Sequence, residues 1–171
     1  DVGKTVASAI LVQALKSDYW KPIQSGDLAN SDSQKVKELI SHSNCQFFGE
    51  TYRLNQPLSP HASAPLDGIE IELKKFELPK SENLIIEGAG GLLVPLNKKN
   101  TILDLIIKLG VEVVLVSKHY LGSINHTLLT IDCLQRNNIP IKGIIFNGAE
   151  NKSTESIILS KTKVSFLGRI E

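Results

Sequence analysis

The first five residues, Asp1-Val2-Gly3-Lys4-Thr5, have the residue types of a phosphate-binding loop. They match the second half of the pattern G-x-x-x-x-G-K-[ST], which opens a helix. Gly3 lets the backbone approach a phosphate, and the N–H groups at the helix start favour an anion. Lys4 would bring a mobile positive charge to the outer phosphates, and Thr5 a hydroxyl to magnesium. The alternative is an ordinary helix start with a surface lysine.

Polar residues also stand at the ends of predicted strands. Lys21 and Ser25 follow a short apolar segment, while Glu87 and Asn147 end two further apolar segments. In open α/β sheets, ligands bind beyond the carboxyl ends of the strands. We therefore expect these four side chains at the same edge of a sheet, where a bound molecule would meet them.

Two carboxylates predict a metal site. Glu87 on a buried strand is costly unless it is paired or binds a metal. Together with Thr5 and Asp32 it would form an oxygen-rich magnesium site. The alternatives are an exposed strand-end position for Glu87, a plain helix cap for Asp32 and a surface position for Lys21.

The elements that must position these residues alternate along the chain. Strands are expected at 19–23, 83–87, 111–116, 141–146 and 164–167, and helices at 6–15, 33–41, 101–109, 122–138 and 153–161. Residues 44–68, which contain three prolines, predict a long irregular connection, and 69–78 a weak helix. The alternation predicts one α/β domain over residues 1–171, with three layers and a mostly parallel sheet flanked by helices. Because a phosphate-binding loop follows a buried strand, we expect that strand to be missing from this chain.

Composition excludes several classes of function. The 171 residues are 42% hydrophobic and 22% charged, with a net charge of +1, so neither nucleic acid nor a membrane is an expected partner. A single tryptophan argues against a base-stacking platform. Cys45 and Cys133 lack CxxC spacing and are expected to be reduced cytosolic thiols. Among the four histidines, which lack metal spacing, His119 is expected at the surface and His126 in a structural role.

The chain closely resembles the dethiobiotin synthetase family in six segments that occur in the same order: DVGKTVA at 1–7, KPIQSG at 21–26, NSD at 30–32, SPH at 59–61, EGAGG at 87–91 and GSINH at 122–126. The resemblance implies an ATP- and magnesium-dependent cyclo-ligase of biotin synthesis. Such enzymes convert 7,8-diaminopelargonate and CO₂ into dethiobiotin through a carbamate and a mixed carbamic–phosphoric anhydride, releasing ADP and phosphate. The resemblance also implies a cytoplasmic homodimer with sites near the subunit interface.

The same resemblance implies roles for individual residues. Lys4 and Lys21 would be catalytic, the second lying around the carbamate and γ-phosphate, and Thr5, Asp32 and Glu87 would hold magnesium. The implied nucleotide-binding set is Asp1, Val2, Gly3, Lys4, Thr5, Val6, Glu87, Gly88, Ala89, Gly90 and Asn147, with Asn147 reading adenine. The implied substrate-binding set is Lys21, Ser25, Gly122, Ser123, Ile124 and Asn125, and the last four would receive the substrate carboxylate from the neighbouring subunit.

The chain departs from the family at both ends, since the first glycine of the loop is missing and family members continue beyond residues 167–170. We therefore expect a chain that is clipped at both ends. Two other functions fit the loop alone: another P-loop ATPase of the partitioning or amidotransferase-related groups, and a non-enzymatic nucleotide-switch module. The other P-loop ATPases are not expected to carry the K-P-x-x-S-G segment.

Overall fold

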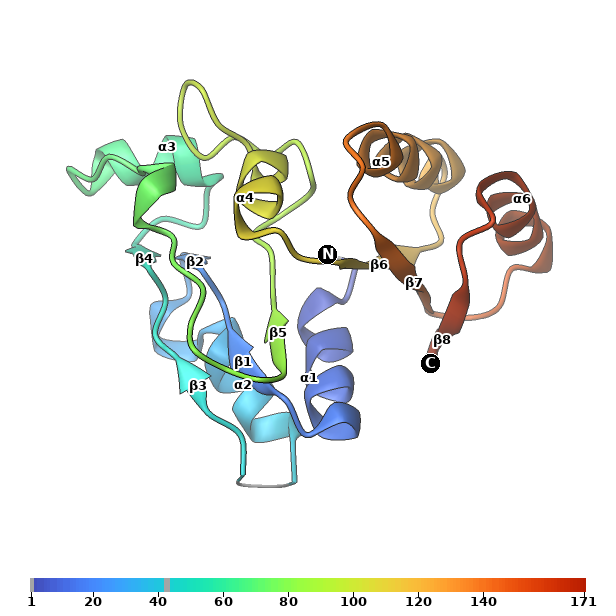
Figure 1. Ribbon diagram of the computed structural model, residues 1–171, viewed down its shortest axis with the longest axis horizontal. Coiled ribbons are helices and arrows are strands. Elements are labelled where there is room, and N and C mark those ends of the chain that lie inside the picture. Colours follow the sequence, from blue (N-terminus) through green and yellow to red (C-terminus); the bar gives the residue numbers. More distant parts are fainter. Residues whose placement is uncertain (1, 42–43) are drawn as a thin grey trace. The chain divides into compact units, whose positions relative to one another are not determined.

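The computed structural model describes residues 2–41 and 44–171, which form two compact units (Figure 1). One unit joins the start of the chain, up to Ala7, to Gly110–Glu171, and the other is Ser8–Leu109. Each pair of named strands is parallel, and helices flank the strands, which confirms the predicted α/β class. Within the described ranges, the helices are all too short or too polar to cross a membrane.

The unit Ser8–Leu109 contains two small parallel sheets. Their strands are β1 (Asp18–Trp20), β2 (Ile23–Ser25), β3 (Phe47–Phe48), β4 (Tyr52–Leu54) and β5 (Leu84–Ile86). One sheet has the order β3-β1-β5, and the other pairs β2 with β4. β1 is thus the central strand of its sheet, as Figure 1 shows, and the residues that follow β1 and β5 leave the sheet side by side.

The helices of this unit bury apolar side chains. They are the greater part of α1 (Lys4–Leu15), then α2 (Asp32–Leu39), α3 (Pro60–Leu66) and α4 (Ile102–Leu109), with 3₁₀ turns η1 (Leu28–Asn30) and η2 (Leu73–Lys75). Ala9 and Val12 lie three residues apart on one face of α1 and pack with Tyr19 and Val36 in a buried cluster. This cluster fixes α1 and α2 against the central strand.

The other unit has one parallel sheet in the order β6-β7-β8, formed by β6 (Val113–Lys118), β7 (Ile141–Asn147) and β8 (Phe166–Ile170). Helices α5 (Ser123–Arg136) and α6 (Lys152–Thr162) accompany it, and α5 contacts β6, β7 and α6 (Figure 1). Ile144 and Phe146 on β7 are fully buried. Since Lys118, Asn147 and Ile170 are in register, the three strands end at a common edge.

The structure corrects three predictions of secondary structure. Residues 44–68 are not an irregular connection, because they contain β3, β4 and α3. Pro60 is the first residue of α3, where its missing N–H costs no helical hydrogen bond. The weak helix predicted at 69–78 is reduced to the turn η2, and the strand predicted at 19–23 is divided at Lys21-Pro22 into β1 and β2.

Candidate functional site

A buried lysine lies between two carboxylates in the unit Ser8–Leu109. Lys21 Nζ lies 2.5 Å from Asp32 Oδ2 and 3.1 Å from Glu87 Oε1. Lys21 is 4% exposed and Glu87 3% exposed, so the alternatives of a surface lysine and an exposed strand-end carboxylate are wrong. Charged groups that are removed from water need such pairing to remain ionised. The fold thus brings together three charged side chains from three separate segments of the chain, with both carboxylates in contact with Lys21 Nζ.

The parallel pairing of β1 and β5 places Lys21 beside Glu87. Trp20 and Ile86 are paired in the register, and Lys21 and Glu87 are the next residues of the two strands. The Glu87 N–H donates to Trp20 O at 3.0 Å, which continues the ladder by one bond. The two side chains are therefore positioned by backbone hydrogen bonds and not only by their mutual attraction.

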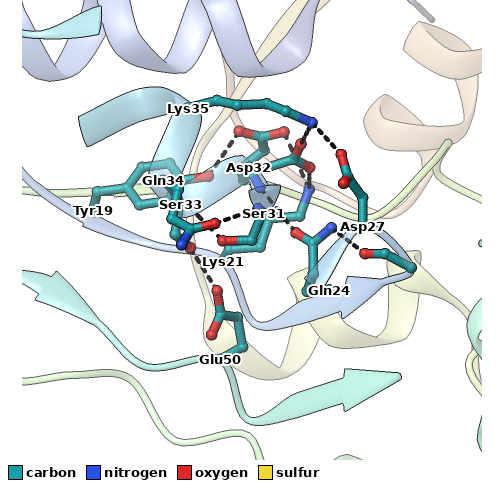
Figure 2. A network of polar contacts seen from close by, with 12 residues as sticks. Tyr19, Lys21, Gln24, Asp27, Ser31, Asp32, Ser33, Gln34, Lys35 and Glu50 are labelled. Atoms are coloured by element: carbon teal, nitrogen blue, oxygen red, sulfur yellow. Dashed lines mark hydrogen bonds and ion pairs between the residues drawn. The ribbon is translucent and has the colours of Figure 1, made fainter. Parts of the chain in front are cut away.

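Asp32 reaches the same point from the start of α2 (Figure 2). The helix cap is Ser31, which forms a capping box with Gln34, so Asp32 is the first helical residue and the cap alternative is wrong. The Asp32 N–H donates to Gln24 Oε1 at 3.2 Å, and Gln24 Nε2 donates to Gly26 O. A carboxylate in the first helical turn is also favoured by the helix dipole.

Tyr19 is a fourth member of this site, and sequence reasoning missed it. Its hydroxyl donates to Glu87 Oε2 at 2.8 Å, and the side chain is fully buried on β1. Burial and the neighbouring Glu87 carboxylate raise the pKa of Tyr19 well above its ordinary value, so the hydroxyl remains a donor. A tyrosine inside a buried strand signals a polar partner, because a buried hydroxyl needs one.

A more exposed layer of polar contacts surrounds Asp32 (Figure 2). Lys35 Nζ lies 2.8 Å from Asp27 Oδ2 and 3.9 Å from Asp32 Oδ1, and its side chain is 36% exposed. Ser33 Oγ donates to Glu50 Oε1 at 2.7 Å. Lys35 thus contacts the same carboxylate as Lys21 but from the solvent side.

Ser25 ends β2 with a buried hydroxyl. Within the described part of the chain, Ser25 Oγ has no hydrogen-bond partner. A buried polar atom in this state is destabilising until another group bonds to it. The observation fits the substrate-side hydroxyl that was predicted for Ser25, although that role stays a prediction.

The predicted phosphate-binding loop belongs to the other unit, together with Asn147. Gly3 has φ +90°, a conformation that side chains rarely adopt, and Lys4 and Thr5 begin α1. Asn147 Nδ2 donates to Val2 O at 2.9 Å, and a Cβ on Gly3 would lie 2.2 Å from the same nitrogen. The predicted adenine-reading residue therefore contacts the loop itself, and only glycine fits at position 3.

The remaining nucleotide-binding predictions divide between the two units. Val6 lies in the first turn of α1 and is exposed. Gly88, Ala89 and Gly90 follow β5, and the chain bends at Ala89 and Gly90. Asp1 lies outside the described residues. The convergence of Lys4 and Thr5 with the Lys21 cluster in one cavity stays a prediction, because the two groups belong to different units.

The segment predicted to receive a carboxylate opens α5. The helix begins at Ser123, and Gly122, with φ +97°, occupies the cap position without a side-chain cap bond. The alternative in which Ser123 caps the helix is therefore wrong. Ile124 and Asn125 are exposed, and the preceding Leu121 is fully exposed. The helix start thus combines backbone N–H groups, an exposed amide and exposed apolar side chains.

A second charged cluster, which sequence reasoning missed, lies in the unit that contains Asn147. Glu155 Oε1 lies 2.8 Å from His119 Nε2, and Glu155 Oε2 lies 2.6 Å from Arg169 Nη2. His119 is mostly buried and stacks on Phe146, so its predicted surface position is wrong. The Arg169 guanidinium holds the pKa of the Glu155 carboxyl at about 2. No sequence motif joins three residues spaced this widely.

Two of the three predicted metal ligands, Asp32 and Glu87, contact the same Lys21 Nζ. Within residues 2–41 and 44–171, three or more His, Cys, Asp or Glu side chains do not gather into a metal-binding group. Asp32 and Glu87 nevertheless suit magnesium, which is commonly held by one or two carboxylates plus substrate phosphate oxygens. The donor set therefore fits a magnesium ion that binds together with a nucleotide.

Comparison with known proteins defines first the class and then the family. The AAA domain family model matches residues 1–171, so the parallel sheets and the phosphate-binding loop are those of an AAA, P-loop type ATP-binding protein. The ATP-dependent dethiobiotin synthetase BioD of Christiangramia forsetii is 56% identical over all of this chain and 83% of its own length. The BioD proteins of Cytophaga hutchinsonii and Brucella ovis are 51% and 44% identical, over 95% and 99% of this chain and 79% and 80% of their own lengths. The chain belongs to the dethiobiotin synthetase family.

Proposed function

We propose that this protein is an ATP-dependent dethiobiotin synthetase that converts 7,8-diaminopelargonate and CO₂ into dethiobiotin. The observation that carries the proposal is the buried Lys21 between Asp32 and Glu87. Lys21 and Glu87 belong to the two segments that are most specific to the family. The names of the three relatives support it, since each is an ATP-dependent dethiobiotin synthetase. The two alternative ATPase and switch functions lack this support.

The proposed reaction has three balanced steps. One substrate amine adds to CO₂ and loses a proton, which gives a carbamate. A carbamate oxygen then attacks the γ-phosphorus, the bond to ADP breaks, and a mixed carbamic–phosphoric anhydride forms. The second amine attacks the carbonyl carbon and loses a proton, phosphate leaves, and the ureido ring closes. Because no step needs a nucleophilic side chain, the protein has to position the reactants and neutralise charge.

The residues of the site fit these requirements. Lys4 and Lys21 neutralise the anionic carbamate and γ-phosphate, which would otherwise repel each other. Thr5, Asp32 and Glu87 would hold magnesium, which would neutralise phosphate charge when bound. Ser25 would bond to the substrate, whose polar atoms would satisfy its buried hydroxyl.

Asn147 would read the adenine base with the part of its amide that faces away from the loop. Its Nδ2 uses one hydrogen for Val2 O, and an amide nitrogen carries two. The second hydrogen and Oδ1 match the acceptor and donor on the edge of adenine. The same contact would couple base recognition to the shape of the phosphate-binding loop.

We further propose that residues 1–171 act as one domain in the cytoplasm. The AAA domain model covers both compact units, which supports a single functional domain. Cys45 and Cys133 are free thiols, which fits a reducing compartment. Neither a nucleic acid nor a membrane is among the proposed partners.

A homodimer would complete the substrate site. Diaminopelargonate carries its amines and its carboxylate at opposite ends of an apolar chain, so it needs a second anion site away from the γ-phosphate. The start of α5 at Gly122–Asn125 offers N–H groups and an exposed amide for this carboxylate. The fully exposed Leu121 beside it supports burial of this helix start against a second subunit.

The function is tested by the substrate dependence of ATP turnover. Phosphate release should require both diaminopelargonate and bicarbonate, and dethiobiotin should form in equal amount to ADP. Turnover that proceeds without diaminopelargonate would identify another ATPase. Nucleotide binding without any turnover would identify a switch module.

Replacing Asn125 by alanine should weaken diaminopelargonate binding by roughly tenfold, because a charge-assisted hydrogen bond is lost, and should leave ATP binding unchanged. Titration calorimetry with each ligand checks this. Gln135→Ala, an exposed substitution on the same helix, is the matched control.

A monomeric variant such as Leu121→Glu, verified by light scattering, should also bind diaminopelargonate more weakly while ATP binding stays unchanged. Undiminished diaminopelargonate binding by that monomer would refute the shared site.

A further inference from the structure

The Lys21 ammonium occupies the position that a divalent cation would need. Its Nζ lies within 3.1 Å of one oxygen of Asp32 and one of Glu87, the two proposed metal-binding carboxylates. An ammonium and a divalent cation that share these oxygens would also repel each other at short range. Lys21 and a bound cation therefore cannot both hold the two carboxylates in the observed way.

Groups other than Lys21 hold the Glu87 carboxylate and the backbone of Asp32 in place. Tyr19 donates to Glu87 Oε2, while Oε1 is the oxygen that faces Lys21. The Asp32 backbone is held by Gln24, and the start of α2 by the capping box of Ser31. If Nζ withdrew, the bond from Tyr19 would still hold the Glu87 carboxylate, and the ordered start of α2 would still hold the Asp32 backbone beside it. The site is therefore already arranged for a cation while a lysine fills it.

We propose that Lys21 is a resident counter-ion, which stabilises Asp32 and Glu87 until a divalent cation takes its place and which then becomes available to the reacting anions. The inference rests on the proposed function, in which these carboxylates hold magnesium. Lys21 would pair with the two protein carboxylates before the cation binds, and with the carbamate or phosphate afterwards. Lys21 would then deliver its charge only to a site that already holds its cation.

Binding of Mn²⁺ to the wild-type protein without nucleotide, measured by electron paramagnetic resonance, tests this competition. Lys21→Met removes the competing charge and keeps most of the side-chain volume, so it should bind Mn²⁺ at least about tenfold more tightly than the wild type. Lys35→Met is the matched control, because Lys35 contacts the same Asp32 from the solvent side, and it should change the affinity by less than about twofold. Equal or weaker Mn²⁺ binding by folded Lys21→Met would overturn the proposal.

Thermal denaturation gives a second readout that does not depend on turnover. Lys21→Met removes the ammonium that Asp32 and Glu87 share, so its Tm should be lower than that of the wild type and should rise more steeply with Mg²⁺. A purely structural Lys21 would give the lower Tm without the steeper rise, and that result would contradict the proposal.

The wild-type chain offers a test if Lys21→Met does not fold. Acetylation of Lys21 by an amine-reactive reagent, followed by mass spectrometry, should be faster at a Mn²⁺ concentration that saturates the site than without metal, whereas Lys35 should react at the same rate. An unchanged rate at Lys21 under saturation would overturn the proposal.

Two further variants separate this inference from the metal assignment. Glu87→Gln made in the wild type should abolish Mn²⁺ binding. Glu87→Gln combined with Lys21→Met should also lose the tighter Mn²⁺ binding that Lys21→Met alone is expected to show. If Glu87→Gln abolishes binding but Lys21→Met does not tighten it, the metal site stands and the counter-ion role is wrong. If Glu87→Gln leaves binding intact in both backgrounds, the metal assignment itself is wrong, and the inference fails with it.

Discussion

Lys4→Ala is expected to lower kcat for dethiobiotin formation by roughly a hundred- to a thousandfold, the effect of removing one transition-state charge donor. Lys4 is the first residue of α1, directly after Gly3, where the helix start and the lysine would act on the same phosphates. A weak anionic nucleophile that attacks an anionic phosphate gains most from positive charge in the transition state. The loss should therefore appear in kcat, and not only in the KM for ATP.

Lys161→Ala provides the matched control for this prediction. Lys161 is an exposed helical lysine in the same compact unit, and its removal should leave kcat unchanged. Both variants should retain the wild-type Tm within a few degrees, since neither lysine belongs to the buried core. Lys4→Ala with wild-type kcat would show that the loop does not bind the transferred phosphate in the proposed way.

Glu155→Gln should lower the free energy of unfolding by about 1–2 kcal/mol at neutral pH, because the buried Glu155 carboxylate accepts a charge-assisted hydrogen bond from the partly exposed Arg169. The pKa of Glu155 is held at about 2, below its ordinary value of 4.5, by Arg169. A carboxyl whose pKa is lower in the folded state than in the unfolded state stabilises the fold at pH values above the unfolded-state pKa. This stability is lost as the pH falls from about 4.5 through about 2. Urea denaturation of the wild type and of Glu155→Gln at several pH values measures this loss of stability.

The difference between Glu155→Gln and the wild type should thus be largest above pH 4.5 and should shrink on acidification. Glu150→Gln is the control: its carboxylate lies 4.0 Å from Lys152 Nζ at an exposed position, so its removal should change the unfolding free energy by less than about 1 kcal/mol. A constant difference across the acid range would mean that Glu155 acts through packing and not through its charge.

The order of strands and helices could be predicted where the pattern was long. β6, β7 and α5 span six or more residues each, and their apolar spacing located them to within two or three residues. β3 and β4 contain two and three residues, which is too few for any period to be recognised. The prolines around α3 were read as signs of an irregular segment, although a proline at the first helical position is compatible with a helix.

The candidate site likewise contains residues that could be predicted from the sequence and residues that could not. Lys21, Asp32 and Glu87 were selected from short segments and predicted strand ends, and the structure brings these three together. Tyr19 was missed because its partner is 68 residues away and only the β1–β5 register reveals the contact. The cluster of His119, Glu155 and Arg169 likewise depends on the packing of three elements. Contacts set by tertiary register cannot be read from local patterns.

The hydrogen bond between Asn147 and Val2 joins residues 145 positions apart, which has a consequence for synthesis on the ribosome. The unit Ser8–Leu109 is continuous in sequence, so it can fold as soon as it emerges. The unit with the phosphate-binding loop is discontinuous, because its first residues must wait for β7 to be made. At roughly 5–20 residues per second, the 145 intervening positions take about 7 to 30 seconds to synthesise. A nascent chain should therefore acquire the buried Lys21 cluster before it acquires an ordered phosphate-binding loop, and truncated products should retain nucleotide only if β7 is complete.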